Sequence, residues 1–203
     1  MRASAFRRVG TRLVVPVALT SFLCGACLAA EAGSPEDAAQ PAVWTTKKLD
    51  FVFQGFTAKY SCDGLKDKVT RALLQLGAQK KDLKVREMGC VNGFGRPDPF
   101  PGVSIKMSVL QPASGSTDSS QPPVAAHWKP VKINLRDIND YPNDSGECEL
   151  YEQIREKVVP LFSTRNVDLS GICVPHQESA AGPTLKLEVL QADAKDTRSA
   201  SAK

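Results

Sequence analysis

Histidine is scarce in this chain, and the residues that build familiar catalytic sites are not arranged in known patterns. There are two histidines, His127 and His176, and no spaced set of metal ligands surrounds them. No serine lies in a G-x-S-x-G turn, and no glycine-rich loop of the phosphate-binding type is present. These absences argue against a zinc enzyme, a serine hydrolase and a nucleotide-binding enzyme.

An excess of charge and long apolar runs are also missing once the first thirty residues are set apart. The formal charge of +4 comes from 26 basic and 22 acidic residues, and four of the arginines lie in that first segment. Without them the chain is formally neutral, which weakens any argument for a nucleic-acid partner. Beyond residue 30 no apolar run is long enough to cross a bilayer. We therefore expect a globular mature chain that does not span a membrane.

Residues 1–30 have the pattern of a cleaved export signal. Arginines precede an apolar region that starts at Leu13, and small residues follow it. Cleavage is expected after Ala29, Ala30 or Ala32. The pattern predicts a periplasmic or secreted protein. Two alternatives stay open, a twin-arginine signal at Arg7-Arg8 and lipidation of Cys24 or Cys27.

The remaining cysteines and an internal repeat indicate two disulfides. An even number of cysteines in an exported protein favours disulfides, although four cysteines allow three pairings. In each of two segments, one cysteine opens an amphipathic run, a second closes the next segment, and a later strand ends in Val-Leu-Gln. We interpret these segments as two copies of one unit, the alternative being a chance likeness. The simplest pairing is then within each copy, Cys62–Cys90 and Cys148–Cys173.

Hydrophobic periodicity predicts two helices and a sheet. Helices are expected at 63–76 and 147–162, with Gly77 ending the first and Pro160 bending or ending the second. Alternation predicts strands at 49–53, 83–86, 102–111, 131–135, 167–169 and 182–191. Clean alternation indicates one buried and one solvated sheet face. The expected fold class is α+β, with two layers, two tandem β-α-β-β repeats and the helices on one face of an antiparallel or mixed sheet.

The expected domain organisation follows from the repeat and from composition. It consists of a signal peptide (1–30), a flexible segment (31–43), repeat unit 1 (44–111), a Ser/Gly/Pro linker (112–126), repeat unit 2 (127–191) and a disordered tail (192–203). The repeat alone leaves open whether the two units form one sheet or two domains.

The solvated face of the predicted sheet carries an excess of cations. Its members are Lys84, Arg86, Lys106, Lys132, Arg136 and Lys186, against Asp50 and Glu188. Such a face could bind an anionic ligand or an envelope surface. Lysine also serves simply to keep exposed strands soluble, which is the alternative. The face lacks the aromatic side chains on which bases stack, and this argues further against nucleic acid.

Aromatic residues supply a weaker set of candidates. Phe94, Arg96 and Phe100 lie in a proline-rich loop after Cys90, where rigid aromatic and arginine side chains could form a recognition patch. The alternative is an ordinary connection whose phenylalanines pack on the core. His176 is expected to be solvated rather than catalytic. Trp44 and Trp128 precede predicted strands, and we expect them to pack rather than bind.

Three short runs, FVFQGF at 51–56, YSCDGL at 60–65 and FGRP at 94–97, give the chain a resemblance to a family of uncharacterised exported proteobacterial proteins. The resemblance covers most of the mature chain. It implies export, and it implies no reaction, ligand or catalytic residue that could be carried over to this sequence.

The leading hypothesis is a non-enzymatic, disulfide-stabilised accessory or binding protein of the bacterial envelope. We expect no cofactor, no metal and no nucleic acid, and an unidentified envelope partner or anionic ligand. One alternative is a small exported enzyme that uses Asp/Glu acid-base chemistry, for example on a polysaccharide. Another is a structural module that self-associates.

Overall fold

The computed structural model describes residues 38–56, 60–90, 99–113, 122–135, 147–171 and 183–192. Contacts divide the chain into two units, Met1–Ala32 and Gly33–Lys203. All the described residues belong to the second unit. The predicted export signal lies outside the described residues.

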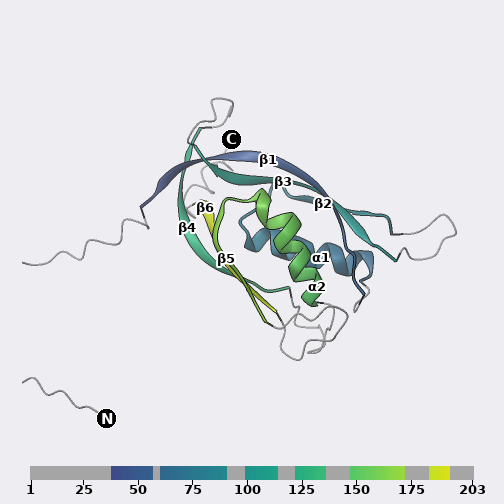
Figure 1. Cartoon of the computed structure of the whole chain (residues 1–203). Coiled ribbons are helices and arrows are strands. Elements are labelled where there is room, and N and C mark those ends of the chain that lie inside the picture. Colours follow the sequence, from purple (N-terminus) through teal and green to yellow (C-terminus); the bar gives the residue numbers. More distant parts are fainter. Residues whose placement is uncertain are drawn as a thin grey trace, which may run out of the picture. The chain divides into compact units, whose positions relative to one another are not determined.

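Strands and helices follow one another in the same order in each half of this unit. The first half consists of β1 (Gln40–Val52), α1 (Cys62–Gln75), β2 (Lys84–Met88) and β3 (Gly102–Pro112). The second half consists of β4 (Val124–Ile133), α2 (Glu147–Gln153), β5 (Thr164–Ser170) and β6 (Thr184–Ala192). The six strands form one antiparallel sheet, and both helices lie on one side of it (Figure 1). The predicted α+β class is confirmed.

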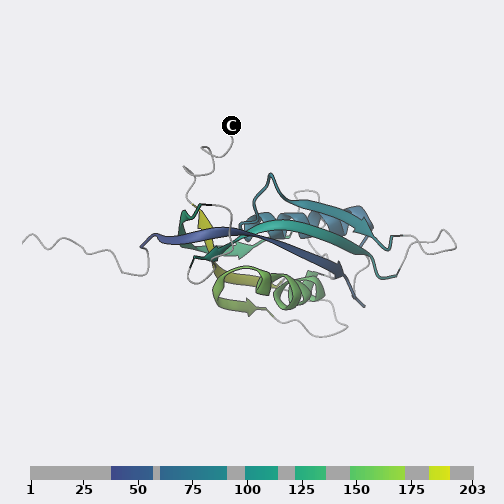
Figure 2. The same ribbon diagram turned by 90° about the horizontal axis from the view of Figure 1, so that it is seen from above.

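The sheet has the strand order β2-β3-β1-β4-β6-β5, which places equivalent strands of the two halves at mirrored positions. Strands β1 and β3 run side by side along their length (Figure 2). The two halves meet at the centre, where Gln40–Ala42 of β1 pairs with Val124–Ala126 of β4. The halves therefore share one sheet instead of forming two separate ones.

The central strands are longer than the sequence pattern indicates. Strand β1 begins at Gln40, inside the segment expected to be flexible, and β4 begins at Val124, inside the expected linker. Trp44 and Trp128 accordingly lie within strands and not before them. Hydrogen bonding of β1 to β3 and of β4 to β6 extends both strands over polar residues, although these residues do not alternate with apolar ones.

One hydrophobic core fills the space between the sheet and the helices. Its buried side chains come from both halves and include Phe51, Leu65, Val69, Ile105, Ile133, Leu150, Ile154 and Leu185. Burial of each such side chain stabilises the fold by about 1.5–3 kcal/mol relative to exposure. Neither half holds this core alone, so we expect the two halves to fold as one cooperative unit.

Helix α1 begins and ends with local signals that the sequence contains. The hydroxyl of Ser61 accepts a hydrogen bond from the backbone N–H of Gly64 at 3.1 Å, which caps the first turn. At the other end Gly77 has a φ of 88°, and the N–H of Ala78 donates to the carbonyl of Leu73 at 2.9 Å. This is the glycine-based helix stop expected at this position.

The second helix departs from its prediction as one α-helix over 147–162. After Gln153 the backbone widens into a π-turn over Ile154–Val158 and then narrows to a 3-10 turn over Val159–Leu161. Pro160 lies in that last turn. Proline has no N–H to continue the α-helical hydrogen bonds, and its ring crowds the preceding turn, so the regular helix cannot run through it.

The sheet face away from the helices is not uniformly solvated, contrary to the alternation argument. Near the sheet centre, Leu110 and Leu190 are buried on this outer face together with Ala42 and Ala126, and Trp44 and Trp128 pack against them. Both tryptophans therefore pack, as expected. The sequence pattern missed this second, smaller cluster because the expected strands began at residues 49 and 131, after the tryptophans and alanines that form it.

Glutamine side chains join each half to the other. The side-chain amide of Gln191 on β6 donates to the carbonyl of Gln75 at the end of α1, at 3.2 Å. The amide of Gln111 on β3 donates to the carbonyl of Leu161 beyond α2, at 3.5 Å. Each Val-Leu-Gln sequence thus ends in a residue that satisfies a helix-end carbonyl of the opposite half.

A buried ion pair connects the two helices. The ammonium of Lys68 on α1 lies 3.8 Å from a carboxylate oxygen of Glu147 at the start of α2. Both residues are more than nine-tenths buried. The pair fixes one helix relative to the other because either charge, left alone in the core, would be costly.

The disulfide Cys62–Cys90 is confirmed, with its Cα atoms 5.8 Å apart. It ties the start of α1 to the chain just after β2. Cys148 is disulfide-bonded as well. Its expected partner, Cys173, lies outside the described residues, so the second pairing stays a prediction.

Candidate anion-binding site

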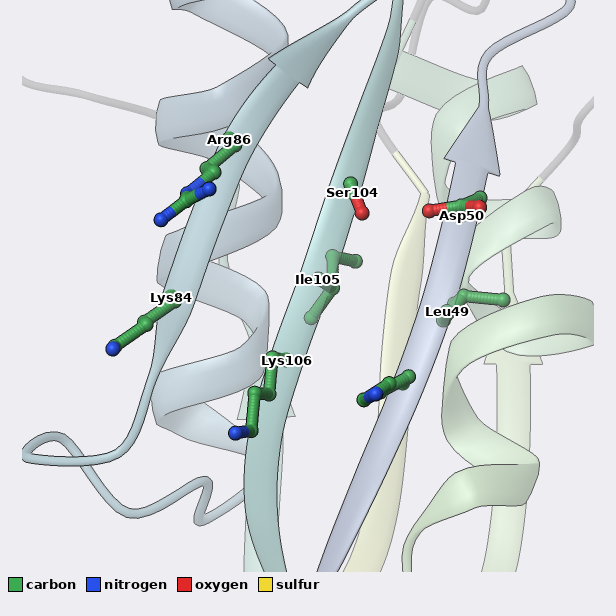
Figure 3. Close-up of a pocket in the computed structure, with 8 residues that line it drawn as sticks. Leu49, Asp50, Lys84, Arg86, Ser104, Ile105 and Lys106 are labelled. Atoms are coloured by element: carbon green, nitrogen blue, oxygen red, sulfur yellow. The ribbon is translucent and has the colours of Figure 1, made fainter.

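Three lysines form a row across the first half of the sheet. Lys48 of β1 is the register partner of Lys106 of β3, and Lys106 is the register partner of Lys84 of β2. Because adjacent strands lie about 4.8 Å apart, the row spans about 10 Å. All three residues are exposed. Figure 3 views this face with the helices behind the sheet, and the labelled Lys84 and Lys106 lie on the side away from the helices. We call these three residues the lysine row.

A second row of polar residues runs beside the lysine row. It consists of Asp50, Ser104 and Arg86, which are also register partners across the same three strands. Side chains two residues apart on a strand point to the same face, so both rows face the solvent together. We call this set the polar row, and Figure 3 shows it next to the labelled Lys84 and Lys106.

The two rows line a shallow concavity of about 550 Å³. Its lining contains four cations, Lys48, Lys84, Lys106 and Arg86, and one carboxylate, Asp50. Like charges directly opposite each other on neighbouring strands destabilise a sheet. In the described part of the chain, none of the three lysines forms an ion pair that would offset this repulsion. The concavity therefore has a concentrated positive potential available to an anion.

A nearby lysine shows the contrasting, compensated arrangement. The ammonium of Lys66 on α1 lies 2.7 Å from Asp63 and 2.6 Å from Glu87. Hydrogen bonds with these two carboxylates raise the pKa of Lys66, and the hydrogen bond from Lys66 lowers the pKa of Asp63. The charge of Lys66 is thus neutralised by two carboxylates of the protein, whereas the charges of the lysine row are not paired in this way.

The second half of the sheet replaces this cation row with a mixed one. Lys132 of β4 pairs in register with Lys186 of β6, and Lys186 pairs with Asp168 of β5. Asp168 occupies the place that Lys84 has in the first half. Beside this row, Arg165 and Asn166 both donate to Glu188, and these contacts lower the pKa of the Glu188 carboxyl. The expected basic face is therefore concentrated on the first half.

The remaining predicted residues divide into those placed elsewhere and those not described. Phe100 lies just before β3 and is 49% exposed. Arg136, Phe94, Arg96, Cys173 and His176 lie outside the described residues. Lys48 is a site residue outside the strand expected at 49–53. Extending the alternation of β1 backwards from Asp50 by two residues would have found it, because Lys48 lies on the same face.

The described residues contain no group of three or more His, Cys, Asp or Glu side chains that could hold a metal ion. Across the same ranges, no helix is long and apolar enough to cross a bilayer.

Comparison with known protein families, curated proteins and solved structures finds no match to this chain. The site is therefore interpreted from its own residues.

Proposed function

We propose that this protein is an exported, disulfide-stabilised binding protein of the bacterial envelope that holds an anionic ligand on the lysine row. The observation that carries the proposal is the register Lys48–Lys106–Lys84, in which none of the three lysines forms an ion pair with a described residue. Such a row costs stability in the free protein. A bound anion would remove the repulsion and gain three favourable charge contacts.

Export is part of this proposal and rests on the pattern of residues 1–30 and on the disulfides. Structural disulfides form and persist mainly in oxidising compartments such as the periplasm. Cys62–Cys90 and the bonded Cys148 fit such a compartment. The N-terminus of the exported protein should follow Ala29, Ala30 or Ala32, which N-terminal sequencing would determine.

Internal duplication is a second part of the proposal. The mirrored strand order and the repeated element order support it. Register gives further support, since Trp44 pairs with Leu110 in the first half and Trp128 pairs with Leu190 in the second. In this interpretation the lysine row of the first half and the Lys132–Lys186–Asp168 row of the second half descend from one ancestral row. Their third residues, Lys84 and Asp168, then diverged, which confined the cation site to the first half.

The other two hypotheses have less support. Paired-carboxylate hydrolysis needs two acidic groups facing one another, and Asp50 is the one carboxylate among the residues that line the concavity. Self-association through a sheet edge would use β2 or β5. Strand β2 carries Lys84, Arg86 and Glu87, and charged residues on edge strands oppose edge-to-edge pairing.

Binding of soluble polyanions tests the proposal. Polyphosphate and polygalacturonate would be titrated into the exported protein by calorimetry at several salt concentrations. We expect affinity to fall as salt rises, and Lys106→Gln to weaken binding and reduce the salt slope by about one. Lys132→Gln is the matched control, because Lys132 occupies the equivalent row in the second half. Equal losses in both variants, or binding insensitive to salt, would overturn the proposal.

A further inference from the structure

The polar row beside the lysine row carries information about the ligand that the lysines alone do not. We propose that the ligand is an acidic polysaccharide, a chain with carboxylate groups and many hydroxyls, instead of a polyanion without hydroxyls. This inference rests on the proposed function of the lysine row and adds a chemical class to it.

Asp50 is the residue that separates the two classes. It is exposed, lines the concavity, and is the register partner of Ser104. An ionised carboxylate only accepts hydrogen bonds, and it repels other anions. A site evolved for a ligand made of anionic groups alone would be weakened by it. A sugar hydroxyl, in contrast, can donate to it.

The rest of the polar row completes a set of sugar-binding groups. The Ser104 hydroxyl can donate or accept, and the Arg86 guanidinium donates in a planar fork that suits a carboxylate. The row therefore presents an acceptor, a hydroxyl and a donor on three adjacent strands. Beside it, about 7 Å along the strands, the lysine row presents charge alone. A ligand chain that carries both hydroxyl and carboxylate groups offers hydroxyls to the polar row and carboxylates to the lysine row.

The shape of the site favours a polymer over a small molecule. Pockets for small ligands are enclosed clefts that bury most of the ligand surface and are lined mainly by apolar and aromatic residues. The concavity here is lined by Leu49 and Ile105 together with six polar or charged residues, and it extends over three strands. Figure 3 shows its labelled lysines and arginine standing at the surface of the sheet. A chain can lie across such a surface and continue beyond it.

The test compares four probes on the exported protein by calorimetry at low salt. These are polygalacturonate, long-chain polyphosphate, neutral dextran and phosphatidylglycerol vesicles. We expect polygalacturonate to bind more tightly than polyphosphate at equal charge concentration, and dextran and the vesicles to bind far more weakly. Asp50→Asn should weaken polygalacturonate binding about tenfold, because a neutral amide oxygen replaces the charged acceptor of the hydrogen bond, and should leave polyphosphate binding equal or tighter.

Asp67→Asn is the matched control, since Asp67 is an exposed carboxylate of α1 away from the concavity. Circular dichroism spectra would verify that both variants fold. If polyphosphate or the vesicles bind best, or if Asp50→Asn strengthens binding of every anion, the polysaccharide inference is wrong while the lysine row remains an anion site. If no polyanion binds, the proposed function fails and the inference fails with it.

Discussion

At the scale of single residues, Lys106 is where the proposed anion binding and the stability of the free protein oppose each other. It lies between Lys48 and Lys84, with a like charge directly opposite on each side. Within the ranges that the structure describes it has no ion-pair partner. The two like charges opposite it make a cation at this place unfavourable for the stability of the sheet.

Lys106→Gln should therefore stabilise the free protein while it weakens anion binding. We expect the free energy of unfolding to rise by about 0.5 kcal/mol at low salt, with a smaller gain at high salt where the repulsion is screened. Urea denaturation at two salt concentrations would measure the change. A loss of stability in Lys106→Gln would contradict the account of the lysine row as a strained arrangement.

Glu188 gives a pH-dependent prediction with a definite sign. The Arg165 and Asn166 side chains hold the pKa of Glu188 below its ordinary value of 4.5. A lowered folded-state pKa contributes stability above the unfolded-state pKa, and this contribution is lost as the pH falls through the folded-state value. The stability difference between the wild type and Glu188→Gln should therefore shrink as the pH falls below the ordinary value of 4.5. A difference that stays constant over this range would mean that the ionised pair does not stabilise the fold.

At the scale of elements, the stop of α1 depends on the backbone conformation of Gly77. Its φ of 88° is strained for any residue with a Cβ, and an added Cβ would lie 3.1 Å from the side chain of Gln191. Gly77→Ala should lower the free energy of unfolding by about 1–2 kcal/mol. Gly64→Ala is the control, because Gly64 lies in the first turn of α1 without a positive φ. Equal losses for both variants in thermal melts would argue against the conformational explanation.

The elements differ in how well the sequence predicts them, for identifiable reasons. Helix α1 matches its prediction to within one residue at each end, since its cap and stop are local signals. Helix α2 does not, because its π-turn depends on packing and on Pro160 and leaves little trace in periodicity. The extra length of β1 and β4 comes from pairing with β3 and β6, which is a non-local property.

The site was predicted in part for the same reasons. Alternation alone identified Lys84, Arg86 and Lys106 as residues of one face. It could not indicate that β1, β3 and β2 are neighbours in that register, nor that Asp168 replaces a lysine in the second half. Register follows from the way distant strands pair, and no single strand contains that information.

At the scale of the whole molecule, the disulfide Cys62–Cys90 closes a loop with a sequence separation of 28 within the first half. Replacing both cysteines by alanine should reduce the free energy of unfolding by about 3–4 kcal/mol, as expected for a crosslink of this length. The two halves share one core, so the denaturation curve should keep a single transition. Separate transitions for the two halves would contradict the shared core.

The most direct measurement of the central claim is a nuclear magnetic resonance titration of the isotopically labelled exported protein with polygalacturonate and then with polyphosphate. The account predicts that amide shift changes concentrate around Lys48, Lys84 and Lys106 and that those around Lys132 and Lys186 stay small. The changes should be smaller in the Lys106→Gln variant at the same polyanion concentration, because one of the four cations of the concavity is removed. Changes of equal size on both halves, or changes centred away from the lysine row, would contradict the account.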